Sequence, residues 1–169
     1  GSIASGVSGN FPTFMNENAA DHILTTGRES QTGLYEISKK IHRIDLTFQG
    51  SNWAQTLTAY GELDEELPAT FSYDGSPLTF KVGVSYKGSA GAEDGTSAKR
   101  SFDISIDYGS STQVLGGYYT IVLNNENQDK SFLRDALYRN CISKYIPAVQ
   151  VNFVNLHING EDYGLYANN

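Results

Sequence analysis

The stretch VQVNFVNLHINGEDYGLY, residues 149–166, predicts two neighbouring strands joined by a tight turn. Asn159 and Gly160 suit a two-residue type I′ turn, because both central positions of that turn require a positive φ. Strand-like sequence lies on each side of the pair. The stretch therefore predicts a β-hairpin that closes the domain.

Five segments upstream predict further strands. In residues 78–88 the apolar side chains alternate cleanly with polar or small ones, which is the pattern of a strand with one buried face. Residues 116–125 alternate less, which predicts a strand buried on both faces. The five segments are residues 41–48, 69–73, 78–88, 101–107 and 116–125.

Two segments predict helices. Residues 51–63 read as a short helix that buries Trp53 and Leu57, with Ser51 or Asn52 as its cap. Residues 129–145 carry apolar side chains at helical spacing, which predicts a longer helix packed on the sheet. The expected cap of this helix is Asp129 or Ser131, and Pro147 follows its end. Together the segments predict an α+β fold, a twisted antiparallel sheet with one main packed helix.

Length and composition bound the class of protein. A chain of 169 residues with 39% hydrophobic and 18% charged residues suits one globular domain. Residues 1–32 lack a clear period and predict an irregular arm or linker, so the domain is expected to span residues 33–169. The net charge of −7 argues against non-specific binding to nucleic acid. No apolar run approaches the roughly 20 residues that a membrane-spanning helix needs.

The residues that usually carry metal or thiol chemistry are sparse. His22, His42 and His157 are far apart and show no metal-ligand spacing, so no metal site is predicted. Cys141 is the single cysteine and falls on the apolar side of the predicted helix, which favours a buried structural thiol. The acidic residues of 62–66 favour a solvated link over a calcium site.

A cluster of cations flanks a loop rich in small residues. Lys87 precedes this loop, and Lys99 and Arg100 follow it. Such a loop can bring backbone N–H groups close to a phosphate, and the flanking cations can neutralise it. A mobile hairpin loop with solvated ends explains the same pattern, and spacing alone does not separate the two interpretations.

Four segments in order give the chain a family resemblance. They are VGVSYKGSAG, AKRSFDISID, IVLNNENQDKSFLRDALY and IPAVQVNFVNLHINGEDYGLY. The set resembles the CotH family, the spore coat protein H-like atypical protein kinases. That family reads V-G-V-R-x-K-G, then K-K-S-F, then D-x-S-F-L-R-[DE]-x-L, V-P-A-P and an N-G-E-Y-Y-G-L-Y hairpin. The resemblance runs from about residue 41 to residue 166.

The resemblance implies a fold, a cofactor and roles for particular residues. It implies a lobe like the small lobe of a protein kinase, with ATP and magnesium bound in the full-length protein. Lys99 or Arg100 would correspond to the basic residues of K-K-S-F and face the nucleotide phosphates. Asp135 would hold such a cation in place, as a helix acid does in kinases. An exposed helix residue is the other interpretation of Asp135.

The chain also departs from the family pattern. Asp103 stands where the family usually has a basic residue, and the sequence stops at Asn169, before the large lobe that carries the catalytic machinery. We therefore expect an N-terminal lobe with no kinase turnover of its own, from a secreted or cell-surface bacterial protein.

A different function remains open on the same sequence. The chain is also consistent with a non-catalytic extracellular interaction or carbohydrate-binding module, with Tyr73, Tyr118 and Tyr119 as candidate contact residues. The expected partners are a protein substrate or protein partner, a glycan, or a second copy of the chain.

Overall fold

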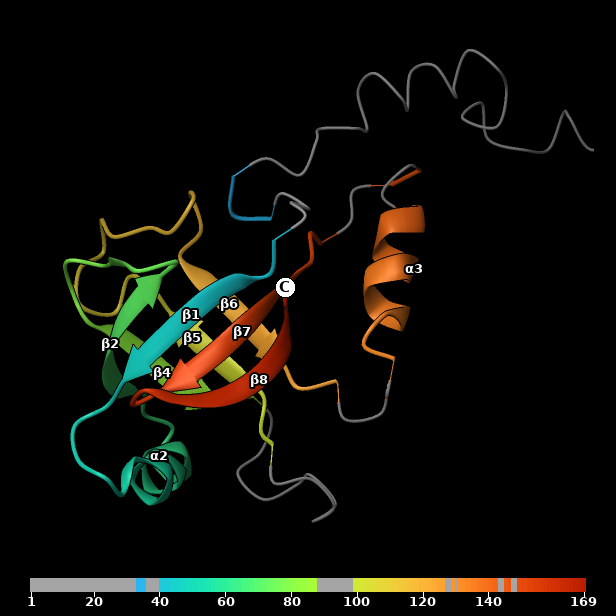
Figure 1. Ribbon diagram of the computed structural model, residues 1–169. Helices are drawn as coiled ribbons and strands as arrows, with labels where there is room; N and C mark the ends of the chain where they lie inside the picture. Colours follow the sequence, from blue (N-terminus) through green and yellow to red (C-terminus); the bar gives the residue numbers. More distant parts are fainter. Residues whose placement is uncertain are drawn as a thin grey trace, which may run out of the picture.

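The computed structural model describes residues 33–35, 40–87, 99–126, 129, 131–142, 145–146 and 149–169. The predicted N-terminal arm, residues 1–32, lies outside the described residues. Figure 1 shows strands wrapped into a barrel, with one helix below it and one beside it. The elements are η3 (Gly33–Tyr35), β1 (His42–Thr47), α2 (Trp53–Glu62), β2 (Leu67–Tyr73), β3 (Ser76–Pro77), β4 (Val82–Tyr86), β5 (Phe102–Ser105), β6 (Thr120–Asn124), α3 (Arg134–Ile142), β7 (Asn152–Ile158) and β8 (Glu161–Asn168).

The strands form a closed ring rather than an open sheet. Their order is β1-β7-β8-β6-β5-β4-β2, and β2 pairs again with β1, while β3 pairs only with β2. β1 and β7 are parallel, and the other neighbouring strands are antiparallel. The predicted α+β fold, a twisted sheet resembling the small lobe of a kinase, is therefore wrong. The described chain is a closed β-barrel with two short helices.

The closing hairpin is confirmed. Asn159 and Gly160 have φ values of 51° and 86°, which is the left-handed backbone that the type I′ turn requires. The turn pairs β7 with β8 along most of their length. The last residues of β8 then pair with β6, so the hairpin supplies two neighbouring strands of the barrel.

Hydrocarbon fills the barrel. Along β1, β2, β5, β6 and β7 alternate residues are buried, as in small barrels whose interior holds side chains and no channel. The fully buried inward residues include Ile44, Leu46, Ala69, Val82, Val84, Ile104, Ile121, Leu123, Val154 and Leu156. The surfaces open to a ligand are therefore the ends of the barrel and its outer face.

The helix α2 covers one end of the barrel, as the sequence predicted for a short helix that buries Trp53 and Leu57. The Trp53 ring stacks on Phe48, with ring centroids 5.1 Å apart, and meets the edge of Tyr163 at 5.7 Å. Asn52 occupies the N-cap position without a side-chain cap hydrogen bond. Packing on the barrel, rather than a cap, therefore stabilises this helix.

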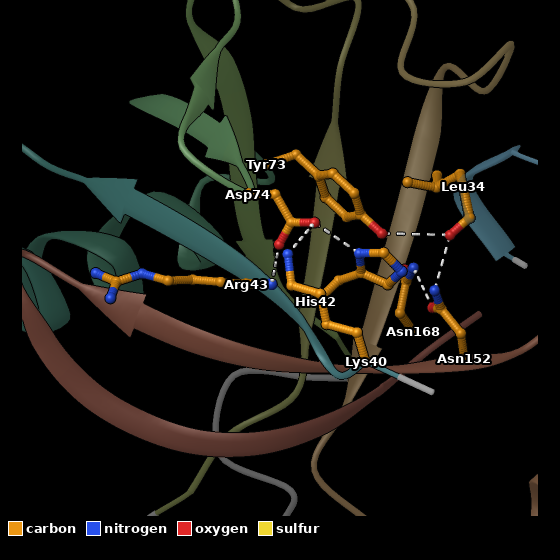
Figure 2. A network of polar contacts seen from close by, with 8 residues as sticks. All are labelled: Leu34, Lys40, His42, Arg43, Tyr73, Asp74, Asn152 and Asn168. Atoms are coloured by element: carbon orange, nitrogen blue, oxygen red, sulfur yellow. Dashed lines mark hydrogen bonds and ion pairs between the residues drawn. The ribbon is translucent and has the colours of Figure 1, made fainter. Parts of the chain in front are cut away.

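The opposite end of the barrel is closed by η3 and a network of polar contacts, shown in Figure 2. The Leu34 carbonyl oxygen accepts hydrogen bonds from Asn152 Nδ2 at 2.7 Å and from the Tyr73 hydroxyl at 3.4 Å. Asn168 Nδ2 in turn donates to Asn152 Oδ1 at 2.9 Å. Burial raises the pKa of Tyr73 to about 12, so its hydroxyl remains a donor at neutral pH. The network attaches η3 to three strands.

Asp74 extends this network on the outer side of the barrel. Its carboxylate accepts hydrogen bonds from His42 Nδ1 at 2.7 Å, from the Arg43 backbone N–H at 2.9 Å and from Lys40 Nζ at 3.2 Å (Figure 2). Burial opposes ionisation, but these donors outweigh it and hold the pKa of Asp74 at about 2. The carboxylate thus joins the end of β2 to the start of β1.

The helix α3 differs from the long packed helix that the sequence predicted over residues 129–145. It spans Arg134–Ile142 and stands beside the barrel in Figure 1. Leu133, Leu137 and Tyr138 are exposed, and the Cys141 thiol is also exposed rather than buried. Helical spacing in the sequence shows that apolar residues lie on one face of the helix, but it does not show that this face packs on the sheet.

The predicted start of α3 is wrong, because the helix begins at Arg134 rather than near residue 129, but the expected cap Asp129 does contact the first helical residue. Asp129 Oδ2 accepts the Arg134 backbone N–H at 2.7 Å, and Asp129 Oδ1 accepts the Ser131 backbone N–H at 3.0 Å. The bond to Arg134 satisfies a backbone N–H that lacks a partner within the helix, and the bond to Ser131 fixes the turn before the helix.

Neither α2 nor α3 combines the length and the apolar character of a membrane-spanning helix.

Two strand predictions need correction. The predicted strand 78–88 is shorter, because β4 begins at Val82 and Phe80 lies outside it with an exposed ring. β6 is buried on one face rather than on both, since only Ile121 and Leu123 are buried along it. Alternation in the sequence reports neither where strand pairing begins nor which faces of a strand the rest of the chain covers.

Candidate functional site

The three candidate cations Lys87, Lys99 and Arg100 lie at one end of the barrel. Tyr86, at the end of β4, pairs with Phe102, at the start of β5, and the Lys87 backbone N–H donates to the Ser101 carbonyl oxygen at 3.0 Å. The loop between the two strands, residues 88–98, lies outside the described residues. We call the group Lys87, Lys99 and Arg100 the basic end.

Lys99 is held over aromatic rings. Its Nζ lies 4.1 Å from the ring centroid of Tyr166 and 5.2 Å from that of Phe132, and it donates to the carbonyl oxygen of Leu165. A cation over a ring face is attracted by the ring quadrupole. Burial lowers the pKa of Lys99, and the negative charge of Asp162 opposes this effect. The contact with Phe132 also places Lys99 beside the segment that leads into α3.

Arg100 stacks on Tyr86. Its guanidinium carbon lies 4.9 Å from the Tyr86 ring centroid, and that ring packs against Phe102 with centroids 5.5 Å apart. Burial raises the pKa of Tyr86, and the positive charge of Arg100 opposes this effect. A guanidinium stacked by its face keeps its N–H donors in the plane, where they can meet an anion edge-on.

Lys87 is oriented by a neutral partner. Its Nζ donates to Asn124 Oδ1 at 3.0 Å, which ties it to the end of β6. Asp103, the residue that departs from the family pattern, lies close enough to Lys87 for the two charges to interact. Burial raises the pKa of Asp103, and Lys87 opposes this effect.

Asp135, the fourth candidate residue, lies in the first turn of α3. Its carboxylate forms an ion pair with Arg139 at 2.7 Å, one helical turn away. Among the described residues it makes no ion pair with Lys99 or Arg100, so the pairing implied by the resemblance stays a prediction. Phe132 nevertheless brings the start of α3 to Lys99, so helix and basic end are neighbours.

Glu126 is a residue of this region that the sequence did not single out. Its φ of 52° is uncommon for a residue with a side chain, and it turns the chain between β6 and α3. Burial raises the pKa of Glu126, the charges of Asp135 and Asp129 raise it further, and Arg139 and Lys87 oppose them. Glu126 therefore lies in the electrostatic range of both Lys87 and Asp135. Acidic residues are common in turns, so nothing in the sequence marked Glu126 as a candidate site residue.

Metal-ligating side chains are not clustered in the described part of the chain. No group of three or more histidine, cysteine, aspartate or glutamate side chains in the described part of the chain is placed to hold a metal ion. The chemistry that these residues offer is the binding of an anion, by one guanidinium and two ammonium groups.

The comparisons with known proteins give the family. Residues 84–168 match the model of a family described as CotH kinase protein. The match runs from the middle of β4 to the end of β8 and includes Lys87, Lys99, Arg100 and Asp135. Because it covers half of the chain, the protein belongs to the CotH kinase family. A search of curated proteins found no match.

Proposed function

We propose that the basic end binds the phosphate groups of ATP in the full-length CotH protein, which transfers phosphate to serine or threonine of a protein substrate. The family membership supports the kinase relationship, and the cluster of cations supports the position of the phosphates. We assign phosphate binding alone to this chain, because no group of three or more histidine, cysteine, aspartate or glutamate side chains among its described residues is placed to hold a metal ion. We also propose that the protein acts at the bacterial cell surface or outside the cell.

The observation that carries the proposal is the way in which two of the cations are held. Lys87 donates to an amide oxygen and Arg100 stacks on a ring, so among the described residues neither forms an ion pair. Neither charge is therefore bound in an ion pair within that part of the chain, and Asp103 and Glu126 act on Lys87 only through longer-range electrostatics. Charge-assisted hydrogen bonds to phosphate are about twice as strong as neutral ones.

The test compares the two lysines that flank β4. Lys87 follows the end of β4, and Lys81 precedes its start with an exposed side chain. We expect Lys87→Gln to weaken ATP binding in isothermal titration about tenfold or more, because one charge-assisted hydrogen bond contributes about 1.5–3 kcal/mol. Lys81→Gln, which removes the same charge from the other end of the strand, should leave affinity within about twofold.

Titrations with and without magnesium, on this chain and on the full-length protein, complete the experiment. Arg100→Lys tests the stacked guanidinium, since it keeps the charge but loses the planar donors. Equal losses for Lys87→Gln and Lys81→Gln would show that only net charge matters. No ATP binding by the full-length protein would remove the phosphate proposal and leave the family assignment intact.

A further inference from the structure

Two exposed aromatic rings lie near the start of β4, at the end of that strand away from the basic end. Phe80 is 48% exposed and Tyr108 is 47% exposed. Phe80 comes just before β4, and Tyr108 follows β5, the neighbouring strand. We call Phe80, Tyr108 and the nearby Glu66 the aromatic platform.

The backbone that carries the rings is fixed by a buried side chain. Gln113 Oε1 accepts the Phe80 backbone N–H at 2.8 Å, and Gln113 Nε2 donates to the carbonyl oxygens of Phe80 at 3.1 Å and Ile106 at 2.7 Å. The Gly109 N–H donates to the Lys81 carbonyl oxygen at 3.0 Å. These bonds tie the segment before β4 to the segment after β5, so the rings are presented by a defined backbone.

Two glycines allow the close approach of these segments. A methyl group at Gly109 would lie 2.7 Å from the Lys81 carbonyl oxygen and 2.9 Å from Phe80 Cβ. A methyl group at Gly83 would lie 2.6 Å from Tyr108 Cδ2 and would collide with the Glu66 carboxylate. Tyr108 and Glu66 therefore both lie directly over Gly83, beside one another.

The carboxylate beside the rings is also held in place. Ser105 Oγ donates to Glu66 Oε1 at 2.5 Å, which fixes one oxygen on the outer face of the barrel. A carboxylate has about four lone-pair sites, so one bond to Ser105 leaves acceptor capacity for a ligand. The platform thus combines the Tyr108 ring, which lies beside a held carboxylate, with a second exposed ring, Phe80, whose Cβ lies next to Gly109.

We propose that the aromatic platform binds a neutral polysaccharide. A pyranose ring presents C–H groups on its faces and hydroxyl groups on its rim, so it can lie on an aromatic ring while a hydroxyl donates to Glu66. Nucleic acid and other polyanions are disfavoured by the carboxylate and by the net charge of −7. This site is separate from the basic end and does not depend on the phosphate proposal.

The experiment is native affinity electrophoresis of the full chain in gels that contain soluble xylan, mixed-linkage β-glucan, glucomannan or dextran. We expect at least one polysaccharide to retard the wild type. Tyr108→Ala and Phe80→Ala should weaken that retardation about tenfold or more, whereas Tyr108→Phe, which keeps the ring, should stay within about threefold. Glu66→Gln should weaken it less than loss of a ring does.

The matched control is Tyr138→Ala on α3, which removes a tyrosine that is 64% exposed but lies outside the platform. It should bind as the wild type does, and circular dichroism should show that each variant is folded. Three results would overturn the proposal: no retardation in any of the four gels, unchanged retardation of a folded Tyr108→Ala variant, or an equal loss for Tyr138→Ala.

Discussion

Replacing Gln113 tests how the described structure holds its loops to the barrel. The side chain is 9% exposed and makes three hydrogen bonds to the backbone, two with Phe80 and one with Ile106. Each such bond contributes about 1 kcal/mol, and its loss leaves a backbone group without its partner. We expect Gln113→Ala to lower the free energy of unfolding by about 3 kcal/mol.

Urea unfolding provides the measurement. The single tryptophan, Trp53, stacks on Phe48 in the folded protein, so its fluorescence reports loss of the barrel end covered by α2. With a slope of about 2 kcal/mol per M, a loss of about 3 kcal/mol moves the midpoint down by about 1.5 M. Circular dichroism followed in parallel shows whether the strands unfold in the same transition.

Two variants separate the hydrogen bonds from the volume of the side chain. Gln113→Glu keeps the shape and the acceptor but replaces the donor by an oxygen facing two carbonyl oxygens, so it should destabilise at least as strongly as alanine. Thr112→Ala removes an exposed neighbour and should cost less than about 0.5 kcal/mol. A loss below about 1 kcal/mol for Gln113→Ala, or a neutral Gln113→Glu, would refute the reasoning.

The two helices and the Asp74 network give two further predictions. Leu57→Ala should lower the free energy of unfolding by about 3 kcal/mol, because Leu57 in α2 is fully buried. Leu137→Ala in α3 should lower it by less than about 0.5 kcal/mol, because Leu137 is exposed. Equal losses in urea unfolding would contradict the placement of α3. The pKa of Asp74 is lowered from 3.8 to about 2, so the stability that its carboxylate contributes is complete above pH 4 and is lost as the pH falls toward 2. The difference in melting temperature between wild type and Asp74→Asn should therefore shrink over that interval, and a constant difference would count against the network.

The sequence predicted the local pieces of the fold and missed the way they close. Asn159-Gly160, the strand of residues 41–48 and the helix that buries Trp53 depend on neighbouring residues, so their patterns are visible in the chain. Closure depends on the pairing of β1 with β7 and with β2. No periodicity reports which distant strand a segment meets. The family resemblance added an expectation of an open kinase-like sheet, which the closed ring overturned.

The candidate site shows the same division. Lys87, Lys99 and Arg100 could be grouped from the sequence because they flank one loop between two strands that pair with each other. Asp135 could be placed on the helix but not given its partner Arg139, since an i, i+4 pair competes with any contact to the barrel. Glu126 and the aromatic platform depend on backbone angles and on glycines that permit close packing. Those features follow from tertiary contacts.

The way in which the cations are held has a consequence for an acidic protein. A carboxylate partner would fix a lysine or arginine well, but it would also cancel the charge that a phosphate needs. A ring face under Arg100 and an amide beside Lys87 fix the two side chains without an ion pair. The nearest acid of α3, Asp135, is itself neutralised by Arg139. The arrangement therefore groups three cations, two of them without an ion pair among the described residues, in a chain whose net charge is −7, and an anion at that end would compete with Asp103 and Glu126 for the charge of Lys87.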